Sequence, residues 1–204
     1  MSNLVITISR GYGSNGKLIG KTLAKELGIG FYDRNLLREA SDASGVSEEY
    51  FGLNDEKVKF SLFKKKPEIS EKPRTPEDDK YVSDDNIFNL QAAHIRTIAG
   101  RESCVIVGRC ADTVLKNHDN IIKIYVYASP KYCIKTIMDM YGVSPTEAER
   151  LIKETDRERS AYYEHYTGKK WNDFSNYDLC LSASALGVEK CVKLIKDYIE
   201  LKND

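Results

Sequence analysis

A glycine-rich stretch close to the N-terminus constrains the fold more than any other feature of this chain. Residues 11–17 read Gly-Tyr-Gly-Ser-Asn-Gly-Lys, which fits the spacing G-x-x-x-x-G-K. In such a loop the backbone wraps a phosphate group with its N–H groups pointing inward, and glycines adopt the required angles at little cost. The sequence therefore predicts a phosphate-binding loop with the candidate ligands Gly11, Gly13, Ser14, Asn15, Gly16, Lys17 and Leu18.

The residues on either side of this loop support the prediction. Residues 4–8 (LVITI) predict a short buried strand, and apolar residues then recur at helical spacing from Leu18 to Leu27 and stop at Gly28. The positive N-terminal end of a helix attracts anions, and Lys17 adds a full charge for the outer phosphates. Residues 1–30 are therefore predicted to bind a nucleotide, in preference to forming an ordinary glycine-rich turn.

The residue after the lysine departs from the usual motif. A serine or threonine commonly binds Mg²⁺ there, whereas this chain has Leu18. A metal ion would then be held through water, or by Ser14 or Thr22, and the sequence leaves these alternatives open. Arg10 precedes the loop, where facing a phosphate and lying on the surface are equally compatible with the pattern.

Further apolar runs extend this unit into an α/β fold. Strands are predicted at 31–32, 104–107, 121–127 and, more weakly, 177–181, with helical patterns between them. Strands that alternate with helices favour a mostly parallel sheet that is covered on both faces. We predict one domain, residues 1–204, with a three-layer α/β sandwich of the P-loop nucleoside-triphosphate-hydrolase type. Helices are expected at 35–40 with Asp33 as the cap, after Ser47, at 86–99, 109–116 and 130–141, from Ser144, and at 187–201.

Residues 64–85 differ in composition from the rest of the chain. The segment KKKPEISEKPRTPEDDKYVSDD contains three of the five prolines, many charges and few apolar residues. Such a segment is expected to be a mobile loop or an insertion without a core of its own. A plain solvated connection and a functional lid are equally compatible with it.

The composition excludes several classes of protein. Lys plus Arg and Asp plus Glu both number 31, so the formal net charge is zero, which argues against a general nucleic-acid binder. The phosphate chemistry must therefore depend on locally placed cations. No apolar run approaches the roughly 20 residues that span a bilayer, and the N-terminus lacks the pattern of a secretory signal, so a cytoplasmic protein is expected without a membrane partner.

Three segments resemble a known family. The runs ITISRGYGSNGKLIGKTLAKELGIGFYDRNLL, CVIVGRCAD and KETDRERSAYYEHYTGKKWNDFSNYDLCLSAS are similar, in this order, to the cytidylate kinase-like proteins, which belong to the nucleoside monophosphate kinase group. The resemblance covers nearly the whole chain. It implies a P-loop sheet, an acceptor-binding region over residues 33–100 and an arginine-bearing lid over residues 144–170.

The resemblance also implies roles for particular residues. Lys17 would act on the phosphates of ATP, Arg109 would grip the acceptor phosphate, and the lid arginines Arg157 and Arg159 would close over the transferring group. By pattern alone, the alternating charges around the two lid arginines are more typical of a solvated helix face, and only the resemblance favours a catalytic role. The residues expected to bind the substrate are Asp33, Arg38, Arg109 and Asp156.

The function that follows is a phosphotransferase that uses ATP and Mg²⁺. It would move the terminal phosphoryl group to a nucleoside monophosphate, with CMP or dCMP as the first expectation. Related kinases commonly have an Asp before the Gly-Arg pair, whereas this chain has Val107, and Asp33 or Asp112 is a candidate to replace that carboxylate. A kinase of another small molecule and a nucleotide-binding regulatory module without turnover are the alternatives, and the oligomeric state is left open.

Overall fold

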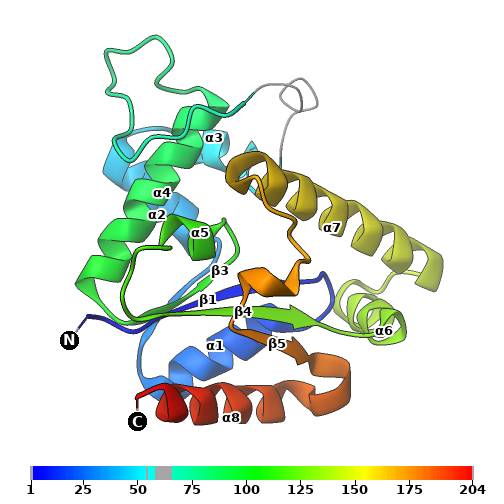
Figure 1. The fold of residues 1–204 in the computed structure, drawn as a ribbon. Coiled ribbons are helices and arrows are strands. Elements are labelled where there is room, and N and C mark those ends of the chain that lie inside the picture. Colours follow the sequence, from blue (N-terminus) through cyan, green and yellow to red (C-terminus); the bar gives the residue numbers. More distant parts are fainter. Residues whose placement is uncertain (1, 54, 58–65, 204) are drawn as a thin grey trace.

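Five parallel strands form one sheet at the centre of the molecule (Figure 1), in the order β2-β3-β1-β4-β5. The computed structural model describes residues 2–53, 55–57 and 66–203. The strands are β1 (Val5–Arg10), β2 (Gly30–Tyr32), β3 (Cys104–Val107), β4 (Ile121–Tyr127) and β5 (Leu179–Ser182). Because β1 lies in the middle, the loop that follows it opens at the centre of the carboxyl edge. The predicted parallel α/β sandwich is confirmed.

One face of the sheet is covered by α1 (Gly16–Leu27) and α8 (Ala183–Asn203) (Figure 1). The apolar residues predicted for the first helix, such as Ile19 and Leu23, are fully buried against the strands, together with Val192 and Ile195 of α8. The first helix ends at Gly28 in a left-handed conformation, as the sequence predicts. Removing these side chains from water is the main term that holds the layer on the sheet.

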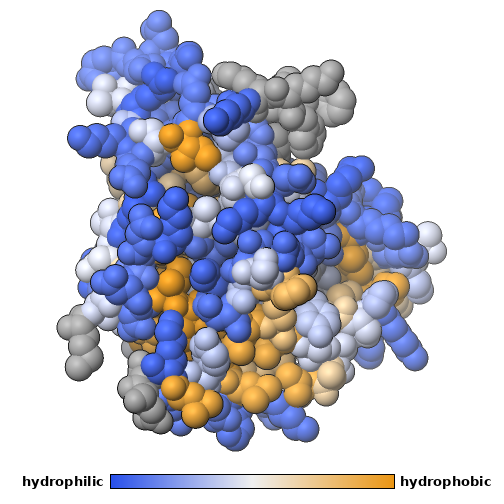
Figure 2. Space-filling model, in the orientation of Figure 1, coloured by the Kyte–Doolittle hydropathy of each residue, from blue (hydrophilic) through white to orange (hydrophobic). Residues whose placement is uncertain are grey.

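The other face is covered by α2 (Asn35–Ser44), α4 (Asp84–Arg101) and α5 (Ala111–Val114), with α3 (Glu48–Leu53) packed beside α2. Ile95 and Ile98 of α4 are buried against Ile106 of β3, which makes this the third layer. Figure 2 shows that the surface around α2, α3 and residues 66–83 is mostly hydrophilic, with a small hydrophobic spot, whereas hydrophobic residues gather lower in the view, around β5 and α8.

Beyond the carboxyl ends of the strands lie α6 (Pro130–Tyr141) and α7 (Pro145–Thr167) (Figure 1). The second of these begins as predicted, because the Ser144 side chain accepts a hydrogen bond from the third helical residue and proline follows it. Its carboxyl half is anchored to α4, where the rings of Tyr166 and Phe88 stack with centroids 4.0 Å apart. A short 3₁₀ turn, Phe174–Asn176, then leads to β5.

Two local predictions are wrong, for identifiable reasons. Asp33 does not cap α2: the residue at the cap is Arg34, without a capping side chain, and the Asp33 carboxylate instead faces cations. The helix predicted at 109–116 is shortened to Ala111–Val114, because Arg109 and Cys110 both have positive φ angles, 58° and 54°, that break the helical pattern before it starts.

Residues 66–83 contain turns and are attached to α4 by side-chain hydrogen bonds. Asn89 Oδ1 accepts from the Ser70 N–H at 2.9 Å, and Asn86 Oδ1 accepts from the Arg74 N–H at 2.7 Å. Both asparagine side chains are buried, so they replace water for backbone groups that have no sheet partner. Residues 64 and 65 of the predicted mobile segment lie outside the described residues, and mobility of 64–85 stays a prediction. In the described part of the chain, every helix is too short or too polar to cross a bilayer.

Candidate functional site

A cavity of about 660 Å³ opens at the carboxyl ends of β1 and β3. Its walls are the glycine-rich loop, the start of α1, the residues that follow β2, the turn at 55–57 and one side each of α6 and α7. Within the described part of the chain, seven cationic side chains line it against four acidic ones. They are Arg10, Lys17, Lys21, Arg34, Lys57, Arg109 and Arg159 against Asp33, Asp55, Glu56 and Glu158. In a chain with no net charge, this local surplus favours a ligand with several negative charges.

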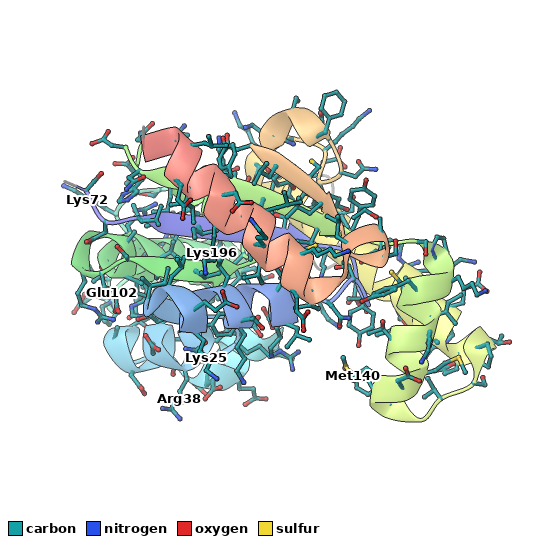
Figure 3. All side chains as sticks on the ribbon, turned by 90° about the horizontal axis from the view of Figure 1, so that it is seen from below. Lys25, Arg38, Lys72, Glu102, Met140 and Lys196 are labelled. Carbon is teal, nitrogen blue, oxygen red and sulfur yellow. The ribbon has the colours of Figure 1, made fainter. Side chains whose placement is uncertain are left out.

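Another part of the cavity lining is apolar. Ile137, Met140 and Tyr141 reach it from α6, and Leu18 reaches it from the start of α1. Figure 3 shows Met140 pointing from α6 back toward the rest of the molecule. Leu18, Met140 and Tyr141 are about half exposed, at 48%, 59% and 54%. A ligand with a charged end and a flat apolar end matches these two walls.

The glycine-rich loop is held from outside by α6. Gly13 has a φ of 80°, and a Cβ there would lie 2.8 Å from the Cys133 carbonyl oxygen, so the loop and α6 approach closely because this residue has no side chain. Asn15, also left-handed at φ 61°, donates from Nδ2 to the Tyr132 hydroxyl at 2.9 Å. The Ser14 hydroxyl is fully buried and accepts from the Gly16 N–H at 3.4 Å. These contacts hold the loop in place against α6.

Lys17 and Asp33, two predicted site residues, form an ion pair across the cavity. The Lys17 ammonium lies 2.6 Å from the Asp33 Oδ2, and the lysine side chain is 63% exposed whereas the carboxylate is almost covered. Burial by itself would raise the pKa of Asp33, but the hydrogen bond from Lys17 and the charges of Arg109 and Arg10 outweigh it, so that the pKa is lowered. The carboxylate therefore stays ionised, and the lysine that pairs with it is largely exposed.

Arg109 is enclosed at the end of β3, with 1% of its side chain exposed. Its Nη1 donates to the Val107 carbonyl at 3.0 Å and lies 3.5 Å from the Asp33 Oδ1, while Nη2 lies 2.9 Å from the Asp55 Oδ1. The structure thus brings Arg109 and Asp33 together, as expected for substrate-binding residues. It also brings the Asp55 carboxylate to Arg109 and the cavity, and sequence reasoning missed this residue.

Glu56 is the second residue that sequence reasoning missed. Its Oε1 accepts from the Arg10 Nη1 at 2.5 Å and from the Arg109 N–H at 3.2 Å, and its Oε2 accepts from the Arg159 Nε at 3.1 Å. Burial would raise the pKa of Glu56, but the charges of Arg10, then of Arg159 and Arg109, outweigh it and hold this pKa well below the ordinary range. Arg10 therefore faces the cavity, which resolves the alternative that the sequence left open.

The lid arginines predicted together are separated by the helix. Arg159 is 12% exposed, donates to the Arg10 carbonyl at 3.2 Å and lies over the Tyr12 ring at 5.4 Å. Arg157 is exposed and does not line the cavity. Residues two apart on a helix point to nearly opposite sides, so only one of the pair faces the loop. Asp156, also predicted, accepts from the Tyr12 N–H at 2.8 Å, and burial raises its pKa despite this bond.

Among Arg38 and the candidate metal ligands, some line the cavity and others lie away from it. Arg38 is exposed on α2, does not line the cavity, and in Figure 3 points outward. Asp112 is buried on α5, where it accepts from the Tyr163 hydroxyl at 2.6 Å, and neither it nor Thr22 lines the cavity. In the ranges that the structure describes, no three His, Cys, Asp or Glu residues are grouped to hold a metal ion. Of the two candidate carboxylates, Asp33 lines the cavity and Asp112 does not.

Comparisons with known proteins find relatives that are described as kinases. A model of the cytidylate kinase-like family matches residues 5–185. A cytidylate kinase of Pyrococcus horikoshii is 26% identical over 198 residues, which cover 97% of this chain and 88% of that protein. An uncharacterized protein from Eubacterium ventriosum aligns with a TM-score of 0.73 at 26% identity, covering 97% of this chain and 99% of its own. A shikimate kinase from Bacteroides thetaiotaomicron shares the fold, with a TM-score of 0.53 at 12% identity and coverage of 97% and 98%.

The family match includes every element of the site, from the glycine-rich loop through Arg109 to α7. With the kinase relatives, it supports a kinase that acts on nucleotides or other small molecules. The resemblance that three sequence runs predict is therefore confirmed. The chain belongs to the cytidylate kinase-like family.

Proposed function

We propose that this protein transfers the terminal phosphoryl group of ATP to a nucleoside monophosphate, with CMP or dCMP as the first candidate acceptor. The observation that carries the proposal is the cationic surplus in one cavity that also contains the glycine-rich loop. Two nucleotides bring several negative charges together, and a site without cations would leave their mutual repulsion uncompensated. The apolar wall at Leu18, Met140 and Tyr141 is suited to a nucleobase.

In the proposed reaction, the protein aligns two phosphates and neutralises the charge that spreads between them. Lys17 leaves Asp33 to bind the outer phosphates of the donor. Arg159 faces the loop from α7 and stabilises charge on the transferring group. An arginine suits this position because its planar fork binds two phosphate oxygens at once.

The acceptor phosphate is assigned to Arg109. Its Nε is buried and has no hydrogen-bond partner within the described residues. A buried donor without a partner is costly, so a ligand phosphate that reached this atom would satisfy it. Asp33 and Asp55 hold the guanidinium in place beside it. Residues 33–100 would then bind the acceptor and residues 144–170 would form the lid, as the resemblance implies.

The residues fit a magnesium ion that is held mainly by phosphate oxygens and water. Mg²⁺ in such sites keeps several waters and uses one or two protein carboxylates. Asp33 lines the cavity next to Lys17 and is ionised, whereas Leu18 offers no hydroxyl and the Ser14 hydroxyl is buried. When bound, the ion would neutralise charge on the donor phosphates.

A coupled assay with ATP, Mg²⁺ and a panel of CMP, dCMP, UMP, AMP and GMP tests the proposal. The expected result is turnover with one pyrimidine monophosphate strongly preferred. ATP binding without turnover on any of these would favour a regulatory module. Turnover only with a hydroxylated small molecule from an added panel of sugars and organic acids would favour the other kinase alternative.

A further inference from the structure

Glu56 lies where two arginine side chains and a backbone N–H of the site converge, although it follows a short helix far in sequence from all three. We propose that Glu56 is a positioning residue: as a fixed internal anion, it holds Arg10 and Arg159 against the glycine-rich loop in the geometry that transfer requires. The inference rests on the proposed function, because the reaction is what makes the position of Arg159 matter.

The contacts of the carboxylate join three separate elements. Oε1 binds Arg10 at the end of β1 and the Arg109 N–H after β3, and Oε2 binds Arg159 on α7. One oxygen therefore contacts residues at the strand ends and the other contacts α7, so a single carboxylate connects the strand ends with the proposed lid. The side chain is only 13% exposed, so water does not compete freely for these bonds.

Without this carboxylate the two arginines would repel each other. Arg159 donates to the backbone carbonyl of Arg10 at 3.2 Å, so the two residues lie close together. Burial lowers the pKa of Arg159, and the neighbouring Arg10 charge lowers it further, which is the signature of like charges in a confined space. Because both guanidinium groups stay charged, an anion that contacts both keeps them side by side. Asp156 also lies near Arg159, with its Oδ1 3.9 Å from Nη1, but Glu56 pairs with both arginines.

The backbone around Glu56 is shaped for this contact. Its φ is 53°, a left-handed conformation that costs a non-glycine residue free energy and persists where the surroundings enforce it. Gly108, with a φ of 77°, lies directly against the carboxylate, and a Cβ there would overlap it and the Arg10 guanidinium. A carboxylate that merely blocked the site until a phosphate displaced it would not require a left-handed backbone and a glycine packed against it.

Chemical rescue separates positioning from a general structural role. Glu56→Gly removes the carboxylate and suits the left-handed backbone, so the variant should fold. We expect its kcat to fall by about 100-fold, the scale of a slightly misplaced catalytic group, with a much smaller change in the KM for ATP. Sodium formate should restore kcat in a saturable way, whereas sodium chloride at equal ionic strength should not.

Two further measurements make the test decisive. Glu56→Gln, which keeps the shape without the charge, should lose kcat as well. Glu26→Gln, which alters an exposed carboxylate on α1 paired with Lys196 of α8, should not. A lower KM with full kcat in Glu56→Gly would overturn the proposal in favour of a displaceable block. Lost activity without rescue by formate would also overturn it, in favour of a merely structural role.

Failure of the proposed function would be visible separately. If the wild-type protein turns over none of the acceptors, thermal unfolding in sodium sulfate still tests the placement of the anion. Sulfate should then stabilise Glu56→Gly more than the wild type, because Arg10 and Arg159 have lost their internal partner. Equal shifts in both proteins would show that Glu56 does not occupy this cluster.

Discussion

Replacing Gly13 by alanine tests whether the glycine-rich loop depends on its contact with α6. The new Cβ would lie 2.8 Å from the Cys133 carbonyl oxygen and 2.9 Å from the Cys133 Cα, both backbone atoms that cannot turn away. The φ of 80° adds a second cost, because an alanine is strained in this region. Both terms act in the same direction and destabilise the folded state.

The magnitude follows from these two terms. A left-handed conformation costs a residue with a Cβ about 1–2 kcal/mol. Overfilling a packed contact costs about 1–3 kcal/mol more. The free energy of unfolding should therefore fall by roughly 2–5 kcal/mol, which corresponds to about 4–20 °C in the melting temperature of a domain of this size.

Gly142→Ala is the matched control, because Gly142 ends α6 with a φ of 67° and its Cβ would meet no atom of the described chain within 4 Å. It carries the backbone strain without the overlap, so its loss should be about 1–2 kcal/mol. Urea unfolding of both variants measures the difference, and calorimetry with ATP should show weaker binding in Gly13→Ala alone. Equal losses of stability in the two variants would refute the close contact between the loop and α6.

Four further outcomes are expected. Lys17→Ala should abolish measurable ATP binding in calorimetry while the circular dichroism spectrum stays unchanged. Arg109→Ala should raise the KM for the monophosphate far more than that for ATP, by about 2–5 kcal/mol in free energy if a buried charge pair is truncated; equal effects on both substrates in steady-state kinetics would contradict its role. Arg159→Ala should lower kcat strongly and Arg157→Ala weakly, since only the first faces the cavity. Wild-type kcat in both variants would show that the two arginines belong to a solvated helix face. The difference in unfolding free energy between wild type and Glu56→Gln should be complete above about pH 5. It should shrink as the pH falls below about 4.3, the ordinary pKa of a glutamate, because the pKa in the folded protein is lower still. A difference that stays constant in acid unfolding curves down to about pH 2 would contradict the ionised, paired carboxylate.

The sequence predicts those parts of the fold that depend on local patterns. The glycine-rich loop, its helix and the three buried strands β1, β3 and β4 follow from residue types at fixed spacing, and each is found close to where it is predicted. The shortened helix α5 is an exception, since its pattern of apolar residues does not reveal that Arg109 and Cys110 adopt positive φ angles. Only contacts made by the folded chain enforce that conformation.

The two carboxylates that sequence reasoning missed show more clearly what local patterns cannot predict. Asp55 and Glu56 lie in a charged stretch whose residue pattern predicts exposure to solvent. The partners Arg10, Arg109 and Arg159 lie about 50 to 100 residues away in the chain. Nothing local distinguishes the two carboxylates from surface acids. The choice between Arg157 and Arg159, in contrast, has a signal: Arg159 lies one turn before the buried Tyr162 and Tyr163, on the side of α7 that packs inward.

The strand order also has a consequence for synthesis on the ribosome. β1 is completed first, but the strand made next, β2, is not its neighbour; its partners are β3 and β4, beginning with Cys104 and Ile121 opposite Val5. During translation, an apolar strand with both edges unpaired must therefore wait until more than half of the chain has emerged. Nascent chains that stall before residue 104 expose an aggregation-prone segment, and they are the ones that would need a chaperone.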